Sequence, residues 1–305
     1  MTTTRYATND DVTIAYETFG DLATGEPLLL IMGLDFQMVW WPDALCELLV
    51  DAGFAVVRFD NRDTGLSTHF ESPARQSPWR ALLGGTAPAY TGTDMLDDVE
   101  AVLDAVGWMS AHLMGISLGG GVAQAAALRR PSRVRSLTSC CSMPCTAPSW
   151  RKLTYLRFRI FREMARLGEP TTPAEAVDVL VAIWRVLSGP APVDEEWVRR
   201  AATVSHDRAP RDPLTTQRQL AAWSRERLPA LSTLRVPTLV ISGEDDPLIT
   251  LSGGRDVARQ VPGAAFRAYP GMGHTLPERV WPAVVADLRE LAGRAGAART
   301  AGASA

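Results

Sequence analysis

Several features that would point to particular partners are scarce in this sequence. Its 305 residues carry 34 acidic and 31 basic side chains, a formal net charge of −3, so it lacks the basic excess that favours nucleic acid or anionic membranes. Lysine is almost missing: Lys152 is the single one among many arginines. No long apolar run follows Met1, so we expect no signal peptide, no membrane span and a cytoplasmic location.

Cysteine and histidine are equally few. The four cysteines are Cys46, Cys140, Cys141 and Cys145. In a reducing compartment we expect them to be structural thiols, not disulfides or metal ligands, and we expect no metal and no cofactor. Only four histidines are present, which leaves few candidates for a general base.

The apolar residues follow two different periods. From Thr4 to Phe19 polar and apolar residues alternate, which predicts an antiparallel hairpin at a sheet edge. Continuous apolar runs then predict buried parallel strands at 27–32, 55–59, 111–114, 134–137 and 237–241, with a weaker one at 264–269. Helical patterns lie between them at 42–52, 94–106, 120–130, 251–261 and 277–291. This alternation predicts a doubly wound, mostly parallel α/β sheet.

One interval breaks the alternation. Residues 146–228 contain helical signals only, so we predict a helical cap inserted into the core, over the strand ends where such sheets bind ligands. The predicted domains are the first part of the core at 1–145, the cap at 146–228, the second part of the core at 229–292 and a disordered tail at 293–305.

The cap is rich in tryptophan. Its four tryptophans either form the core of the cap or line an apolar substrate pocket, and the sequence leaves both interpretations open. Trp150, Trp184 and Trp223 are our candidates for substrate binding. A basic amphipathic stretch at 151–167 also lies in the cap, and a solvated helix face explains it most simply.

The central motif is Gly115-Ile116-Ser117-Leu118-Gly119. It follows an apolar run and passes directly into a small-residue helix, which is the layout of a nucleophile elbow. Such a sharp turn holds its serine in a strained conformation, so the residues two before and two after it must lack side chains. Ser117 is therefore the predicted nucleophile, with the helix N-terminus beside it to favour negative charge.

A serine nucleophile requires a base and an orienting acid. In the chain order of this motif both follow the serine, which excludes His69 and His112, while His206 lies inside the cap. His274 remains as the base. The acid is expected after the strand at 237–241, where Asp246 precedes a proline that fixes the turn; Asp245 is its main competitor.

The reaction also needs donors for an oxyanion. The backbone N–H of Leu118 is one. The loop after the first parallel strand supplies the second from Leu34, with Gly33 allowing close approach. The polar segment 60–67 is interpreted as a structural turn beside this loop and not as an acid site.

Taken together, these motifs resemble a known family. Met32-Gly33-Leu34, the segment 58–67 and Gly115-Ile116-Ser117-Leu118-Gly119-Gly120 are similar to the α/β-hydrolases related to aclacinomycin methylesterase. The likeness continues through 205–208, 243–247 and Gly273-His274, and so covers nearly the whole chain. It implies a Ser117, Asp246 and His274 triad, with Gly33 and Leu118 at the oxyanion hole. Met32 stands where many α/β-hydrolases have histidine, which leaves the backbone donor in place.

We therefore expect a serine carboxylic-ester hydrolase acting on a mid-sized apolar ester. The resemblance implies the methyl ester of a polyketide as a candidate substrate. A serine at the elbow argues against epoxide or haloalkane hydrolysis, which use a carboxylate there. Carbon–carbon bond hydrolysis and perhydrolysis use the same triad and stay open. So does a ligand-binding protein that keeps the fold without hydrolysis.

Overall fold

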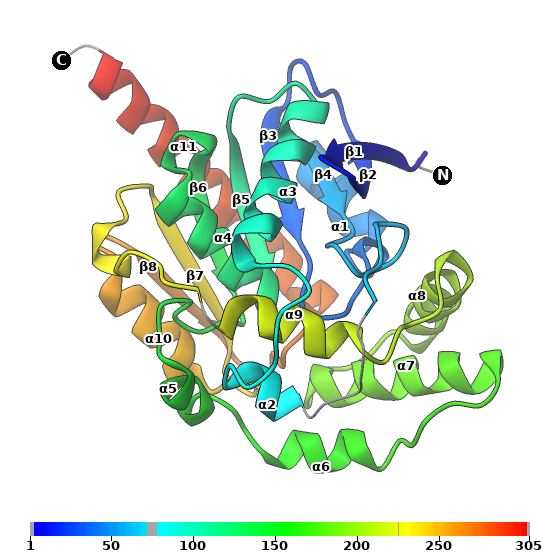
Figure 1. The fold of residues 1–305 in the computed structure, drawn as a ribbon. Coiled ribbons are helices and arrows are strands. Elements are labelled where there is room, and N and C mark those ends of the chain that lie inside the picture. The colour runs from blue at the N-terminus through cyan, green and yellow to red at the C-terminus, as the bar shows by residue number, and fades with distance from the viewer. Residues whose placement is uncertain (1–2, 72–77, 225, 304–305) are drawn as a thin grey trace.

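The computed structural model describes residues 3–71, 78–224 and 226–303, which contain one eight-stranded sheet (Figure 1). The strands are β1 Arg5–Asn9, β2 Val12–Phe19, β3 Glu26–Ile31, β4 Phe54–Phe59, β5 Ala111–Ile116, β6 Val134–Cys140, β7 Thr238–Gly243 and β8 Ala265–Tyr269. Their spatial order is β1-β2-β4-β3-β5-β6-β7-β8. The hairpin β1–β2 lies at one edge of the sheet, and β2 pairs with β4 antiparallel. The strands β3 to β8 pair with their neighbours in parallel. This confirms the predicted fold class.

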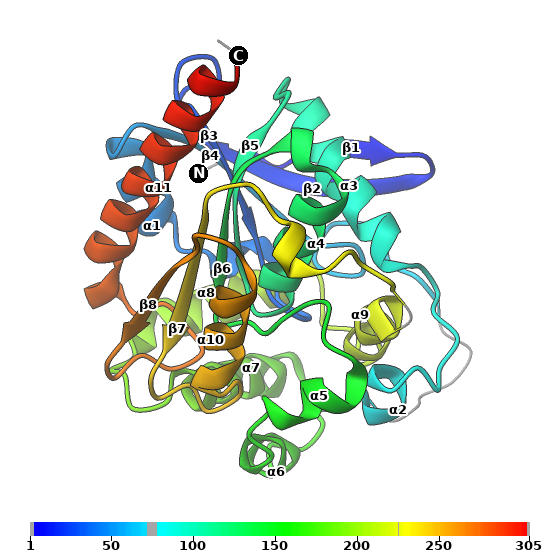
Figure 2. The ribbon, with the colours of Figure 1, turned by 90° about the vertical axis from the view of Figure 1, so that its left-hand side faces the viewer.

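Helices cover both faces of the sheet (Figure 2). One face packs against α3, α4 and α10, and the other against α1 and α11. The bounds are α1 Asp43–Asp51, α3 Gly92–Ala105, α4 Leu118–Arg129, α10 Leu251–Gln260 and α11 Trp281–Ala303. Short 3-10 turns are η1 Met38–Trp40, η2 Pro131–Arg133, η3 Leu231–Thr233 and η4 Glu278–Val280. Because both faces are covered, the central strands are buried along their whole length, as their continuous apolar runs predict.

Five helices between β6 and β7 lie at one end of the sheet (Figures 1 and 2). They are α5 Ser149–Thr154, α6 Arg159–Ala165, α7 Pro173–Ser188, α8 Glu195–Arg208 and α9 Thr215–Ser224. A sixth, α2 Pro78–Leu82, comes from the segment expected to belong to the core and packs against α9. The cover over the strand ends thus draws on two separate parts of the chain.

The basic stretch expected as one helix is divided into α5 and α6. Between them the chain pairs with the loop after β7: Leu156 forms an antiparallel bridge with Ile249, and Arg157 N–H donates to Leu248 O at 2.9 Å. Thr250 N–H donates to Tyr155 O at 2.7 Å. These tertiary hydrogen bonds hold the chain extended and so interrupt the helical pattern.

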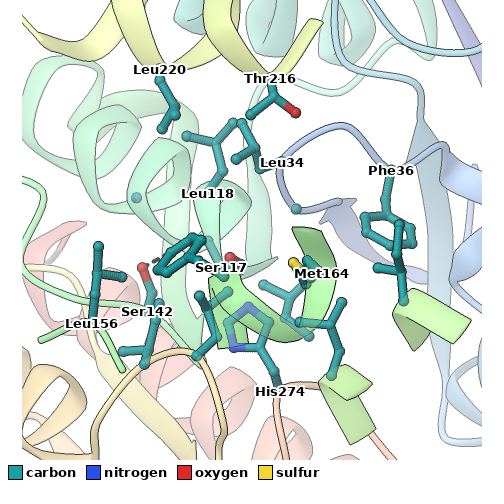
Figure 3. A pocket seen from close by; sticks show the side chains of 18 of the residues that line it. Leu34, Phe36, Ser117, Leu118, Ser142, Leu156, Met164, Thr216, Leu220 and His274 are labelled. Atoms are coloured by element: carbon teal, nitrogen blue, oxygen red, sulfur yellow. Dashed lines mark hydrogen bonds between the residues drawn. The ribbon is translucent and has the colours of Figure 1, made fainter. Parts of the chain in front are cut away.

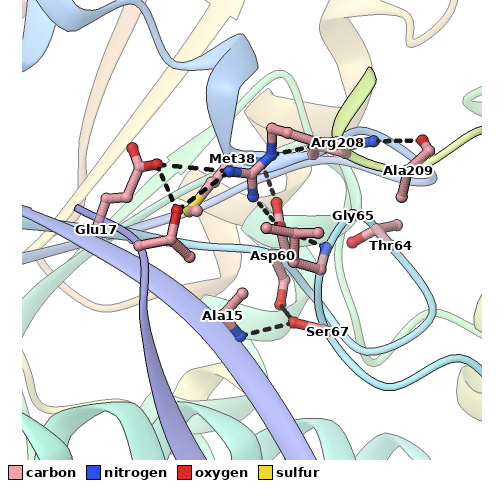
Figure 4. A network of polar contacts seen from close by, with 12 residues as sticks. Ala15, Glu17, Met38, Asp60, Thr64, Gly65, Ser67, Arg208 and Ala209 are labelled. Atoms are coloured by element: carbon pink, nitrogen blue, oxygen red, sulfur yellow. Dashed lines mark hydrogen bonds and ion pairs between the residues drawn. The ribbon is translucent and has the colours of Figure 1, made fainter. Parts of the chain in front are cut away.

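Arg208, at the end of α8, anchors this cover to the sheet (Figure 4). Its guanidinium pairs with Asp60, which follows β4 directly and has a fully buried side chain. Asp60 Oδ1 also accepts Met38 N–H at 2.7 Å, and Asp60 O accepts the Ser67 hydroxyl at 2.6 Å. Burial raises the pKa of Asp60, against the opposing charge of Arg208. The segment 60–67 is therefore a buried structural turn that receives a cap residue.

Substituting Arg208 with methionine should destabilise the fold by about 3–5 kcal/mol, because it leaves the buried Asp60 carboxylate without its counter-charge. Arg200→Met, on the same helix, is the matched control: its ion pair with Glu196 is exposed, so the loss should stay below about 1 kcal/mol. Urea denaturation measures both. Equal losses in the two variants would contradict the anchoring role.

The C-terminal segment departs from expectation. The tail predicted to be disordered from residue 293 instead continues α11 as far as Ala303. Alanine is the commonest residue from 293 to 303, and its high helix propensity offsets the three glycines there, so the segment can extend an existing helix without apolar periodicity. Within the described residues, no helix combines the length and apolar character needed to cross a bilayer.

Candidate active site

Ser117 occupies the turn between β5 and α4. Its backbone is left-handed, with φ 56° and ψ −118°, a strained conformation for a residue with a side chain. The flanking glycines are required by space: a Cβ on Gly115 would lie 2.0 Å from Gly119 O, and one on Gly119 would lie 2.2 Å from Ile31 O. The turn thus has the packing that the elbow motif predicts.

Asp246 and His274 come together from the ends of two neighbouring strands. Asp246 follows β7 and His274 follows β8, and Asp246 Oδ2 lies 2.7 Å from His274 Nδ1. Both side chains are buried. The other carboxylate oxygen, Oδ1, accepts the backbone N–H groups of Leu248 and Ile249, each at 2.8 Å. The acid is therefore held rigidly, with one oxygen aimed at the imidazole.

The adjacent carboxylate, Asp245, has a different hydrogen-bond partner. Asp245 Oδ2 accepts the backbone N–H of Gly271 at 3.0 Å, at an exposed turn. Asp245 therefore holds the loop that leads to His274, and within the described structure it forms no hydrogen bond or ion pair with the imidazole. The geometry favours Asp246 over its competitor.

Ser117 and His274 line the same cavity, which Figure 3 shows with both side chains on its wall. No hydrogen bond joins the two side chains in the described structure. Such contacts are often long in unliganded enzymes and tighten when substrate binds. The structure therefore brings Asp246 and His274 into contact, and Ser117 lies on the cavity wall that His274 also lines.

The proposed oxyanion donors lie beside the serine. A Cβ on Gly33 would stand 3.3 Å from Ser117 Cβ, so the loop after β3 runs close to the elbow. Asn61 Nδ2 donates to Met32 O at 3.0 Å and holds that loop. Among the described residues, no acceptor is found for the N–H of Leu34 or of Leu118, and both residues line the cavity. Two backbone donors are thus free for a developing negative charge.

The cavity has a volume of about 480 Å³ and lies between the strand ends and the helical cover. Its wall is mostly apolar, with contributions from α2, α6, α7 and α9. Trp184 and Trp223, two of the three candidates for substrate binding, line it. Such a space suits a mid-sized, largely apolar molecule.

Trp150 corrects one expectation. Its side chain is 67% exposed and does not line the cavity, because it lies in the first turn of α5, at the surface. Trp197 packs against Trp40 and Trp184, with ring centroids 6.0 and 5.5 Å away, and serves the apolar core. The tryptophans of the cap are therefore divided between both interpretations.

Sequence reasoning missed Trp79 and Leu82 of α2, which also line the cavity. Trp79 contacts Phe161 of α6, with ring centroids 4.6 Å apart. A tryptophan directly after a proline, in a segment without strand or helix periodicity, was the one available signal.

Three groups of metal-ligand type meet beside the acid and base. Ligand atoms of Cys141, Asp246 and His274 lie within 4.8 Å of one another. A hydrogen bond with Cys140 and burial raise the pKa of Cys141, and its thiol lies 3.7 Å from Gly273 O as a donor. A thiol must lose its proton to bind a metal, and His274 Nδ1 is already engaged by Asp246. The geometry therefore favours an acid and base pair over a metal centre.

Two of the three remaining histidines, His112 and His69, have structural partners. His112 is buried in β5 between Ser136 Oγ at 2.7 Å and Glu26 Oε1 at 3.0 Å. His69 Nε2 lies 2.9 Å from Gly65 O. His206 lies on α8 and does not line the cavity. All four cysteines are free thiols.

The fold and this site define an α/β-hydrolase. A family model described as the alpha/beta hydrolase fold matches residues 27–278, so the chain belongs to that family, as its motifs predict. Rhodomycin D methylesterase DnrP from Streptomyces peucetius is 31% identical over 303 residues, covering 93% of this chain and 96% of that protein. This relative supports the assignment of the chain to the carboxylic-ester hydrolases.

Solved structures share the fold. The esterase RhEst1 from Rhodococcus sp. ECU1013 superposes with a TM-score of 0.71 at 22% identity, covering 95% of this chain and 98% of that one. The meta-cleavage product hydrolase CumD from Pseudomonas fluorescens IP01 superposes with a TM-score of 0.68 at 17% identity, covering 95% and 98%. At these identities the likeness concerns the fold alone.

Proposed function

We propose that the protein hydrolyses carboxylic esters through a Ser117, His274 and Asp246 triad. The observation that carries this proposal is the arrangement at the strand ends: a strained serine and His274 border one cavity, and Asp246 lies 2.7 Å from His274 Nδ1 behind it. Each group has the environment that its role requires. The serine lies at a helix N-terminus, and the carboxylate is fixed by backbone donors.

In the first half-reaction Ser117 Oγ attacks the ester carbonyl carbon while His274 Nε2 accepts its proton. The oxyanion of the tetrahedral intermediate accepts hydrogen bonds from the N–H groups of Leu34 and Leu118. When the intermediate collapses, the carbon–oxygen bond to the alcohol breaks and His274 returns the proton to the leaving alkoxide. Asp246 keeps the proton of the imidazole on Nδ1 throughout, so that Nε2 can accept.

In the second half-reaction water takes the place of the alcohol. His274 removes a proton from the water, which attacks the acyl carbon, and Ser117 leaves with that proton restored. The reaction uses no cofactor and no metal.

For the substrate we propose a mid-sized, largely apolar small-molecule ester, with the methyl ester of an aromatic polyketide as the leading candidate. A mostly apolar cavity of about 480 Å³ supports the size and polarity. The 31% identity to a protein named rhodomycin D methylesterase supports the methyl ester. In this proposal Trp184 and Trp223 contact the acid portion of the substrate.

A fluorophosphonate probe tests the nucleophile directly, because it phosphonylates a serine only where a base and an oxyanion hole activate it. We expect one adduct per chain, mapped by peptide mass spectrometry to Ser117, and no adduct in Ser117→Ala. No adduct in the native protein, or an adduct that persists in Ser117→Ala, would contradict the proposal.

A further inference from the structure

One charged side chain on the cavity wall has no partner. Lys152 lies on α5 and lines the cavity, and among the described residues no carboxylate or hydrogen-bond acceptor pairs with its ammonium group. The other permanently cationic side chain on the wall, Arg211, is paired with Asp35. Lys152 is also the single lysine of the sequence.

The surroundings of Lys152 supply no counter-charge. Burial lowers its pKa, and among the described residues the Cys145 thiol is the one titratable neighbour that acts against this shift. Burial in turn raises the pKa of Cys145 to about 12, so this thiol is neutral at pH 7. An ammonium group partly removed from water and left without an anion is unfavourable. An anion bound in the cavity would relieve that cost.

Lys152 and the triad residues belong to different elements around the cavity. It shares the α5 side of the cavity with Leu156, four residues later, and with Cys145 of the segment that follows β6. The triad and the free N–H groups lie at the strand ends, on the elbow and on the loops after β3, β7 and β8. A molecule that fills the cavity can therefore present one group to Ser117 and another to Lys152.

We propose that Lys152 binds a carboxylate on the acid portion of the substrate, so that the preferred substrate is a half-ester with its ester group at Ser117. This rests on the proposed function. The acid portion of the substrate must carry the negative charge, because the alcohol portion of a methyl ester is a methyl group and has no second functional group. A carboxylate is fully ionised at neutral pH, and its hydrogen bond to an ammonium group is charge-assisted.

Matched pairs of methyl esters test this inference. Monomethyl adipate, suberate and sebacate are compared with methyl hexanoate, octanoate and decanoate; within each pair a terminal carboxylate replaces a methyl group. Methanol release gives kcat/KM for the native protein, Lys152→Met and Lys152→Arg. We expect Lys152→Met to lower the ratio of half-ester to neutral ester at least tenfold at one chain length or more, and Lys152→Arg to keep most of it.

Arg151→Met is the matched control, because Arg151 belongs to the same helix but pairs with Asp256 outside the cavity. It removes one positive charge and should leave the ratio unchanged. A ratio that is the same in Lys152→Met and in the native protein at all three lengths overturns the inference.

A binding measurement separates this inference from the proposed function. In a Ser117→Ala background, calorimetric titration with monomethyl suberate does not depend on hydrolysis. We expect the added Lys152→Met substitution to weaken binding at least tenfold, with methyl octanoate affected less than twofold. Equal affinities with and without Lys152 overturn the inference, whereas the lack of any fluorophosphonate adduct or ester turnover overturns the proposed function alone.

Discussion

Replacing Ser117 with alanine should lower kcat for ester hydrolysis by about 10⁴-fold or more, while the thermal midpoint of unfolding changes little. The reason is chemical: the variant lacks the atom that forms the acyl-enzyme, but its Cβ stays in the same left-handed turn between Gly115 and Gly119. Turnover of a p-nitrophenyl ester measures the rate, and circular dichroism during heating checks the fold.

Ser142→Ala is the matched control for this prediction. Ser142 also lines the cavity, and its hydroxyl donates to Ser117 O at 2.9 Å, so it lies next to the nucleophile without an activating base. Its loss removes one neutral hydrogen bond, for which we expect less than a tenfold effect on kcat. A Ser142→Ala variant as inactive as Ser117→Ala would show that the assigned nucleophile is wrong.

The sheet and its flanking helices were predictable because their sequence signals are local. A strand covered on both faces is mostly apolar, and β3, β4, β5 and β7 have that character in the sequence itself. The Asp246–His274 contact was predictable for a related reason. Both residues follow neighbouring parallel strands, and the ends of such strands meet at one edge of the sheet.

The cover over the cavity was harder to predict because its contacts are not local. The segment 205–208 takes part in the family resemblance, but the local sequence does not reveal the contact of Arg208 with the buried Asp60, 148 positions earlier. The break between α5 and α6 depends on backbone hydrogen bonds to the loop after β7. The side of α5 that faces the cavity follows from that docking, which is why Lys152 lines the wall and Trp150 does not.

Substitution of Asp246, the one of two adjacent carboxylates that contacts His274, should also have a large effect on kcat. Asp246→Asn should lower kcat by about 10³- to 10⁴-fold, because an amide at this position can donate to His274 Nδ1 and so favour the tautomer that cannot accept the serine proton. The amide oxygen can still accept the N–H groups of Leu248 and Ile249, so the loop and the thermal midpoint should be preserved.

Asp245→Asn is the matched control, one residue away. Among the described residues its carboxylate accepts a hydrogen bond from the Gly271 N–H alone, and an asparagine oxygen can accept the same bond, so we expect less than a threefold change in kcat. The rate of fluorophosphonate labelling provides a second measurement, since it reports activation of Ser117 without ester turnover. It should fall in Asp246→Asn in parallel with kcat and stay near the native rate in Asp245→Asn. If the two substitutions had the opposite order, Asp245 would be the acid, and the loop after β7 would have to rearrange to bring it to His274.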